Sequence, residues 1–388
     1  MFKKKHLAHL AVSGLITLGV YGQASADTFR FALGFPSGAP IEAGKAYADA
    51  VKKYTDGKHR VRIFELSLLD HSEMNDGVGQ GLADIGYLLT AYTPSEYPHS
   101  NMGADLSMVM ALDDTITNQE GFAYSGAMLE YIMMNCEECQ AEFTKNNIVY
   151  TGVVSTPSYV MFCNDPVTTL NDIKGKRIRI SGAPWARWTR AFDATPVVLP
   201  IGDAYEALSQ GVIDCTFFSP TELTNFNLIE VVKNIIPNVP GGLYAAGGAS
   251  SLNKTKWDAM STEEKTAFLK AGAVMSAEIT YRYQEQALAD LEKAQEQGIK
   301  IIEAEPEVVA KSHAFIEEDL NFIPKFYHNE YNLNEERLTE LSQTMLDLIE
   351  KWKGIIANAD IQNANDLRDI YWQEVYSKID PNTYSPKQ

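Results

Sequence analysis

The segment KRIRISGAPWARW, residues 176–188, concentrates basic side chains in an acidic chain. The sequence of 388 residues has a formal net charge of −18 at pH 7, yet this segment places Arg177, Arg179 and Arg187 beside two tryptophans. A guanidinium group donates two parallel, charge-assisted hydrogen bonds to a carboxylate, a geometry that an ammonium group cannot reproduce. The segment therefore predicts a site that binds a small organic anion.

The element that must position these arginines is a predicted strand, KRIRI. Side chains alternate between the faces of a strand, so Arg177 and Arg179 share one face. SGAP then turns the chain, and Pro184 suits the first turn of a following helix, whose N-terminus favours anions. Only one arginine needs to face the ligand, and we expect the other to pair with surface acids. The spacing alone is equally compatible with both arginines lying on a solvated strand edge.

Aromatic residues follow on the predicted helix. Trp185, Trp188 and Phe192 fall at positions i, i+3 and i+7. This spacing favours a core-facing stripe over a ligand-contacting wall.

Motifs for other chemistry do not occur in the sequence. There is no H-E-x-x-H or G-x-S-x-G, and the five histidines after residue 26 lack the spacing of metal ligands. The run GVGQG, residues 77–81, mimics a phosphate loop but lacks its final glycine spacing and its lysine. We predict no catalytic residue, no metal and no cofactor, and expect a protein that is not an enzyme.

The first residues have the order of a secretory signal peptide. Three lysines precede an apolar run from Leu10 to Val20, and the small residues ASA end at Ala26. The run is shorter than the roughly 20 residues of a membrane-spanning helix. We expect export with cleavage after Ala26; the alternative is a cytosolic chain with an apolar start. Removing residues 1–26 takes away three lysines and no acid, and the resulting charge of −21 disfavours nucleic acid as a partner.

The four cysteines form two groups. Cys136 and Cys139 make a C-x-x-C in an acidic helical stretch without a nearby histidine, which we interpret as a solvated helix face, whether or not the pair is oxidised. Cys163 and Cys215 each end an apolar run. In an oxidising compartment, a bridge between these strand ends is a further hypothesis.

Strand and helix patterns alternate along the chain, with helical patterns such as 41–54 between most strands. This order predicts an α/β fold with largely parallel sheets covered by helices, and the length favours two domains. The predicted strands are residues 28–35, 59–66, 85–88, 146–154, 159–163, 176–180, 196–200 and 212–218.

Two helix starts have a serine followed three residues later by a glutamate. Ser219 precedes Pro220 and Glu222, and Ser261 opens a helix predicted to run from Thr262 to Gln297. At 1.5 Å per residue the second helix is roughly 54 Å long, which suits a helix that bridges two domains. Its one glycine, Gly272, is predicted to allow a bend. The tail from Val308 onward is predicted to be mostly helical.

Two segments resemble a known family. CNDPVTTLNDIKGKRIRISGAP…DATPVVLPIGDAYEALSQGVIDCTFFSP (163–220) and SLNKTKWDAMSTEEKTAFL (251–269) are similar to solute-binding proteins of tripartite ATP-independent periplasmic (TRAP) transporters, of the DctP type. The resemblance covers residues 27 to about 320. It implies a two-lobed, type II periplasmic-binding-protein-like fold with a hinge and a long bridging helix, and it assigns Arg179 to the ligand carboxylate.

This resemblance also implies domain boundaries. Residues 1–26 are the signal peptide. The first lobe comprises 27–154 plus about 241–287, and the second comprises 155–240 plus about 288–388, including the helical C-terminal tail.

The chain departs from the family pattern at polar positions. Phe217 and Phe218 stand where the family often has an asparagine, and Tyr159 lies nearest to a second arginine of some members. The pocket therefore keeps one arginine and gains aromatic rings, which favours a carboxylate with an apolar or aromatic body over a sugar acid. The predicted ligand-binding residues are Arg179, Trp185, Tyr159, Phe217, Phe218, Ser219, Ser37, Tyr87 and Tyr92.

The resemblance implies a periplasmic solute-binding subunit, which captures a small organic acid and delivers it to the integral-membrane permease subunits of a TRAP transporter. One alternative is a periplasmic sensor that presents the closed form to a receptor, which the sequence does not separate from transport. A second is an enzyme on the same fold, which the missing catalytic motifs disfavour.

Overall fold

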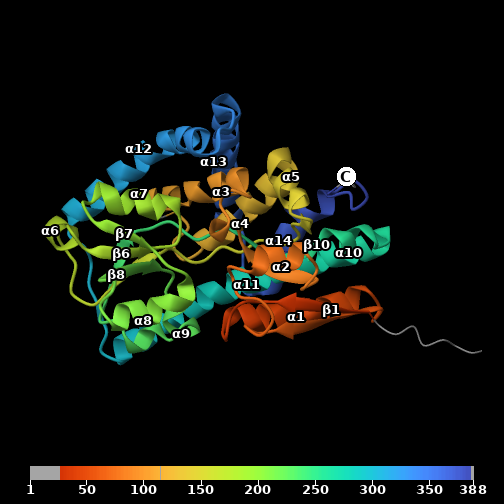
Figure 1. The fold of residues 1–388 in the computed structure, drawn as a ribbon, viewed down its shortest axis with the longest axis horizontal. Helices are drawn as coiled ribbons and strands as arrows, with labels where there is room; N and C mark the ends of the chain where they lie inside the picture. Colours follow the sequence, from red (N-terminus) through yellow and green to blue (C-terminus); the bar gives the residue numbers. More distant parts are fainter. Residues whose placement is uncertain (1–26, 114, 386–388) are drawn as a thin grey trace, which may run out of the picture.

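The structure, a computed structural model, describes residues 27–113 and 115–385. The predicted signal peptide and its cleavage site after Ala26 lie outside these ranges. The strands form two separate sheets, which define two lobes (Figure 1). In spatial order, the first-lobe sheet contains β2 (His59–Phe64), β1 (Asp27–Ala32), β3 (Ile85–Leu89), β10 (Gly247–Asn253) and β4 (Ile148–Val149). The second-lobe sheet contains β11 (Lys300–Ile301), β9 (Asn234–Pro240), β5 (Val160–Cys163), β8 (Cys215–Phe218), β6 (Arg177–Ile180) and β7 (Thr195–Val198).

The chain passes between the two sheets more than once. It leaves the first sheet between β4 and β5, returns between β9 and β10, and reaches the second sheet again at β11. β5 and β10 are the first strands after the chain changes sheet through a loop, and both run antiparallel to their neighbours. β5 lies between β8 and β9, and β10 lies between β3 and β4. The two-lobed α/β architecture is as predicted, but the sheets are mixed and not largely parallel.

Helices cover the outer faces of both sheets. In the first lobe α1 packs against β2 and α2 against β3, and in the second α7 packs against β6 and β7. No helix within the described ranges is long and apolar enough to cross a membrane. The helices are α1 (Ala39–Tyr54), α2 (Met74–Gly79), α3 (Pro98–Asp105), α4 (Glu120–Glu130), α5 (Glu137–Lys145), α6 (Leu170–Ile173), α7 (Ala183–Ala191), α8 (Ala204–Ser209), α9 (Glu222–Asn225), α10 (Lys254–Asp258), α11 (Thr262–Glu296), α12 (Pro306–Tyr331), α13 (Glu335–Ala357) and α14 (Ala364–Glu374).

The predicted bridging helix is α11, a single helix of 35 residues. Ser261 and Glu264 form the expected capping box at its start, where each side chain accepts a hydrogen bond from the other residue's backbone N–H. The helix packs on α1 and β10 of the first lobe and on α9 and β11 of the second. It therefore connects the two lobes along one side of the molecule.

The C-terminal tail differs from the prediction that residues 288–388 belong to the second lobe. The last helices pack on α4 and α11 beside the first-lobe sheet. Tyr371 Oη donates to the carbonyl of Phe122 at 2.8 Å, and Tyr376 Oη donates to that of Thr151 at 3.0 Å. Buried tyrosines need such partners, and these tie the tail to the first lobe.

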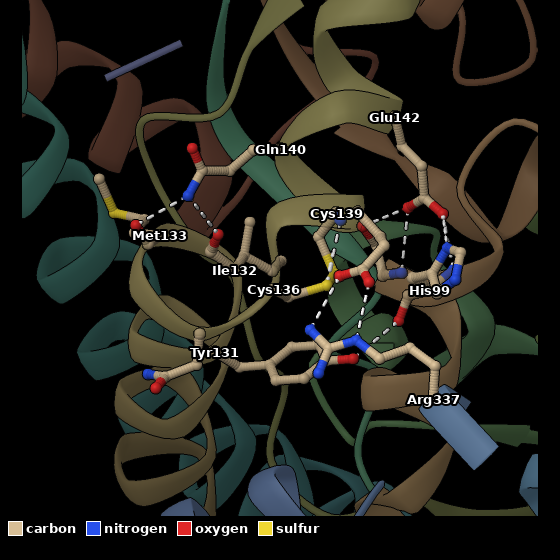
Figure 2. Close-up of a disulfide and its surroundings, with 12 residues drawn as sticks. His99, Tyr131, Ile132, Met133, Cys136, Cys139, Gln140, Glu142 and Arg337 are labelled. Atoms are coloured by element: carbon tan, nitrogen blue, oxygen red, sulfur yellow. Dashed lines mark hydrogen bonds and ion pairs between the residues drawn. A yellow bond between two sulfur atoms is a disulfide. The ribbon is translucent and has the colours of Figure 1, made fainter. Parts of the chain in front are cut away.

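All four cysteines are in disulfides. Cys163 and Cys215 lie directly opposite each other on β5 and β8 and are bridged, as hypothesised. Cys136 and Cys139 are bridged at the start of α5 (Figure 2) and are at most 1% exposed. The interpretation of that stretch as a solvated helix face is wrong, because the start of α3 covers α5 and because Arg337 of α13 reaches it to pair with Glu138.

Candidate ligand-binding site

A cavity of about 40 Å³ lies between the two lobes. The first lobe contributes Tyr87 from the middle of β3 and Tyr92, three residues after that strand ends, and the second lobe contributes Arg179 from β6 and Phe218 from β8. The space exceeds the 10–15 Å³ that one water needs. The cavity is also lined by Tyr159, Ser181, Glu222, Tyr244 and Tyr283.

Arg179 is the cation of this cavity. Its residue exposure is 1%, and burial lowers the pKa of its guanidinium. Nε donates to the carbonyl of Leu199 at 3.1 Å, and Nη1 donates to Ser181 Oγ at 2.6 Å. The guanidinium carbon lies 4.2 Å from the ring centroid of Phe218, a cation–π contact. These contacts fix the guanidinium. No carboxylate of residues 27–113 or 115–385 forms an ion pair of 4 Å or less with Arg179.

The second arginine of the strand has a different role. Arg177, at the start of β6, is half-exposed and pairs with Asp214 at 2.7 Å. The expectation that one arginine faces the site while the other pairs with a surface acid therefore agrees with the structure.

Five of the nine predicted ligand-binding residues line the cavity: Arg179, Tyr159, Phe218, Tyr87 and Tyr92. The other four do not. Trp185 stacks behind Tyr159, with ring centroids 4.6 Å apart, and supports it from the core.

The remaining three face elsewhere. Phe217 points to the opposite side of β8 from Phe218, because side chains alternate along a strand, and it packs on Trp188. Ser219 is buried outside the cavity, and Ser37 is exposed in the turn before α1.

Glu222 is the functional candidate that the sequence analysis missed, because it was interpreted as a helix-capping acid. The predicted cap is wrong: α9 begins at Glu222 itself, and Ser219 makes no side-chain cap. Glu222 is 4% exposed and lines the cavity, and burial raises the pKa of its carboxyl to about 7. The available signal was an acid four residues after Phe218, the last residue of an apolar strand that contributes to the site.

A larger groove of about 340 Å³ adjoins the cavity, and Tyr92, Arg179 and Ser181 line both spaces. Tyr92 Oη of the first lobe accepts a hydrogen bond from the backbone N–H of Ile201 in the second at 3.2 Å. This contact joins the two lobes at the boundary between the cavity and the groove. Within the described ranges, no group of three or more His, Cys, Asp or Glu residues could hold a metal ion.

Two lobes that enclose a cavity with one fixed guanidinium and several aromatic rings define a two-lobed solute-binding protein. The family model DctP, described as bacterial extracellular solute-binding protein, family 7, matches residues 37–325. The chain belongs to this family, and the resemblance noted in the sequence is confirmed.

Known proteins agree with this membership. A solute-binding protein of Albidiferax ferrireducens is 21% identical over 65% of this chain and 73% of its own length. A TRAP solute-binding protein from an unidentified marine microbe, specific for aromatic acid ligands and crystallised with 3-hydroxybenzoate, has a TM-score of 0.70 at 21% identity, covering 84% of this chain and 99% of its own. A TRAP periplasmic solute-binding protein of Bordetella bronchiseptica with bound mandelate has a TM-score of 0.69 at 18% identity and the same coverage. These likenesses confirm the predicted fold.

Proposed function

We propose that this protein captures a small organic carboxylate between its lobes in the periplasm, after cleavage following Ala26, and delivers it to the membrane permease subunits of a TRAP transporter. The observation that carries the proposal is the buried Arg179, which lines the inter-lobe cavity without a carboxylate partner in the described part of the chain. A buried guanidinium needs a compensating anion, and a ligand carboxylate is the group whose geometry matches it.

Further support comes from the family and its solved structures. Membership in an extracellular solute-binding family favours binding and delivery over catalysis. The two similar structures hold 3-hydroxybenzoate and mandelate, which are both carboxylates with an aromatic body. The aromatic lining of the cavity here favours the same kind of body.

The matched pair of arginines on β6 supplies the test. Isothermal titration with a panel of aliphatic and aromatic acids identifies a carboxylate ligand for the wild type. We expect Arg179→Lys to weaken its binding by tenfold to a hundredfold, since hydrogen bonds to charged groups contribute about 1.5–3 kcal/mol. Arg177→Lys, two residues away on the surface, should leave affinity unchanged. Equal affinities in all three proteins would refute the role of Arg179.

A further inference from the structure

Besides Arg179, a buried carboxyl group, that of Glu222, lines the cavity. Glu222 Oε1 accepts a hydrogen bond from Thr221 Oγ1 at 3.1 Å, while Oε2 is buried without a hydrogen-bond partner among the described residues. Asn225 Oδ1 accepts a hydrogen bond from Gln286 Nε2 at 2.8 Å, while its amide nitrogen is buried without a partner among the described residues, and Asn225 does not line the cavity. None of the cavity-lining residues donates a hydrogen bond to Glu222 Oε2, which leaves this oxygen available to a donor on a bound ligand.

Arg179 and Glu222 do not neutralise each other directly. Both line the cavity, yet no ion pair of 4 Å or less joins them. A buried charge that lacks a partner costs several kcal/mol, so each of these two groups favours a ligand group of opposite sign. A ligand with one negative and one positive group satisfies both, and the filled cavity is then neutral overall. A dicarboxylate would instead place a second anion near Glu222.

The rings around Glu222 also favour a cation. Tyr87 and Tyr283 line the cavity and hold each other through their hydroxyls at 3.4 Å. Tyr244 lines it too, and its buried hydroxyl has no partner among the described residues. Aromatic faces attract a desolvated cation by about 2 kcal/mol. Tyr87, Tyr244 and Tyr283 therefore line the same cavity as the carboxyl group of Glu222.

We infer that the ligand is a compact zwitterion, whose carboxylate binds Arg179 and whose protonated nitrogen donates to Glu222 Oε2. This inference rests on the proposed function and narrows its ligand class from organic acids in general to acids that carry an ammonium or ring N–H₂⁺ group.

Pairs of acids that match in shape and differ in charge test the inference. The pairs are proline with cyclopentanecarboxylate, piperidine-2-carboxylate with cyclohexanecarboxylate, and 3-(aminomethyl)benzoate with 3-ethylbenzoate. In titration calorimetry with the full protein, we expect the zwitterion of the best-fitting pair to bind at least tenfold more tightly than its partner. Equal affinity, or tighter binding of the plain acid, would overturn the inference.

Two variants assign the preference to Glu222. Glu222→Gln keeps the size of the side chain and should abolish the preference, while the exposed Glu206→Gln should preserve it. Unchanged discrimination in Glu222→Gln would also overturn the inference. Thermal melting without ligand shows that each variant is folded, and an unfolded Glu222→Gln is replaced by Glu222→Met, with the same expected outcome.

The outcomes separate this inference from the proposed function. Carboxylates that bind through Arg179 without a preference for zwitterions would leave the proposed function standing and remove only the inference. Binding of no carboxylate at all would overturn both.

Discussion

Arg187 of α7 and Asp105 of α3 bring their charges to within 3.5 Å of each other across the boundary between the lobes. Arg187 also forms a two-pronged pair with Asp319 of α12 at 2.7 and 2.8 Å, and Tyr327 Oη donates to Asp105 at 3.0 Å. Burial raises the pKa of Asp105 to about 7, although Arg187 opposes this effect. Asp105, Arg187 and Tyr327 line the groove beside Arg179, so this cluster joins the two lobes next to the candidate ligand site.

Asp105→Asn should weaken ligand binding by roughly three- to tenfold, because the closed form loses an attraction that the open form does not make. Titration calorimetry measures the affinity, and small-angle scattering should show a larger radius of gyration without ligand. Asp203→Asn, at an exposed position, is the control. Wild-type affinity and dimensions in Asp105→Asn would show that the cluster does not hold the lobes together.

His71 should make the fold sensitive to acid. Its ring is buried against Phe35 and Tyr92, both ring nitrogens lack partners among the described residues, and burial lowers its pKa to about 4. Between pH 6.5 and 4 the unfolded chain takes up a proton that the folded protein does not, so stability is lost as the pH falls through this window.

Chemical denaturation at pH 7 and pH 4.5 measures this effect. The wild type should lose about 2 kcal/mol more of its free energy of unfolding than His71→Gln does, since each unit of pKa difference contributes about 1.4 kcal/mol. The comparison with the variant cancels the opposite contributions of Asp105 and Glu222, whose raised pKa values favour folding at low pH. If the wild type and His71→Gln lost the same free energy of unfolding between pH 7 and pH 4.5, the role assigned to His71 would be contradicted.

Gly272→Ala should destabilise the protein by at least about 1 kcal/mol. A Cβ at this position of α11 would lie 2.0 Å from the backbone oxygen of Thr151, which cannot move like a flexible side chain. Gly354→Ala in α13 is the matched control, because nothing lies within 4 Å of a Cβ there. That change should stabilise by about 0.5–1 kcal/mol through helix propensity. Thermal denaturation of both variants checks the prediction. It fails if Gly272→Ala and Gly354→Ala both stabilise or both destabilise the protein.

The two disulfides should contribute unequally to stability. The Cys163–Cys215 bridge joins residues 52 positions apart, whereas Cys136–Cys139 spans three. Longer loops lose more entropy in the unfolded chain when they are closed, so the Cys163→Ala and Cys215→Ala double variant should lose about 2–4 kcal/mol. The corresponding Cys136 and Cys139 double variant should lose clearly less. Denaturant unfolding compares the two, and a larger loss at the short bridge would contradict the expectation.

The predicted elements succeeded where side-chain patterns decide the structure. The capping box of α11, the apolar alternation of β1 and β6 and the apolar run of β8 are local signals, and the helix and these strands formed as expected. Predicting that Arg179 lies in the site required only the alternation of side chains along a strand and the family pattern.

What the sequence did not reveal depends on contacts distant along the chain. β10, GGASSLN, lacks the β-branched residues typical of strands, yet it is fully buried because small residues fit between β3, β4 and α11. Gly272 permits the close approach of Thr151 to α11, a contact that the local sequence does not indicate. Glu222 resembles a helix cap in the sequence because Tyr87 and Tyr92 of the first lobe, which share its cavity, are distant along the chain.

The most direct test of the central claim is a crystal structure of the protein with the tightest-binding acid identified by titration. We predict that the ligand lies between the lobes with a carboxylate oxygen within hydrogen-bonding distance of the Arg179 guanidinium. A ligand bound in the same cavity with its carboxylate held by other groups, and Arg179 left without contact to it, would contradict the account.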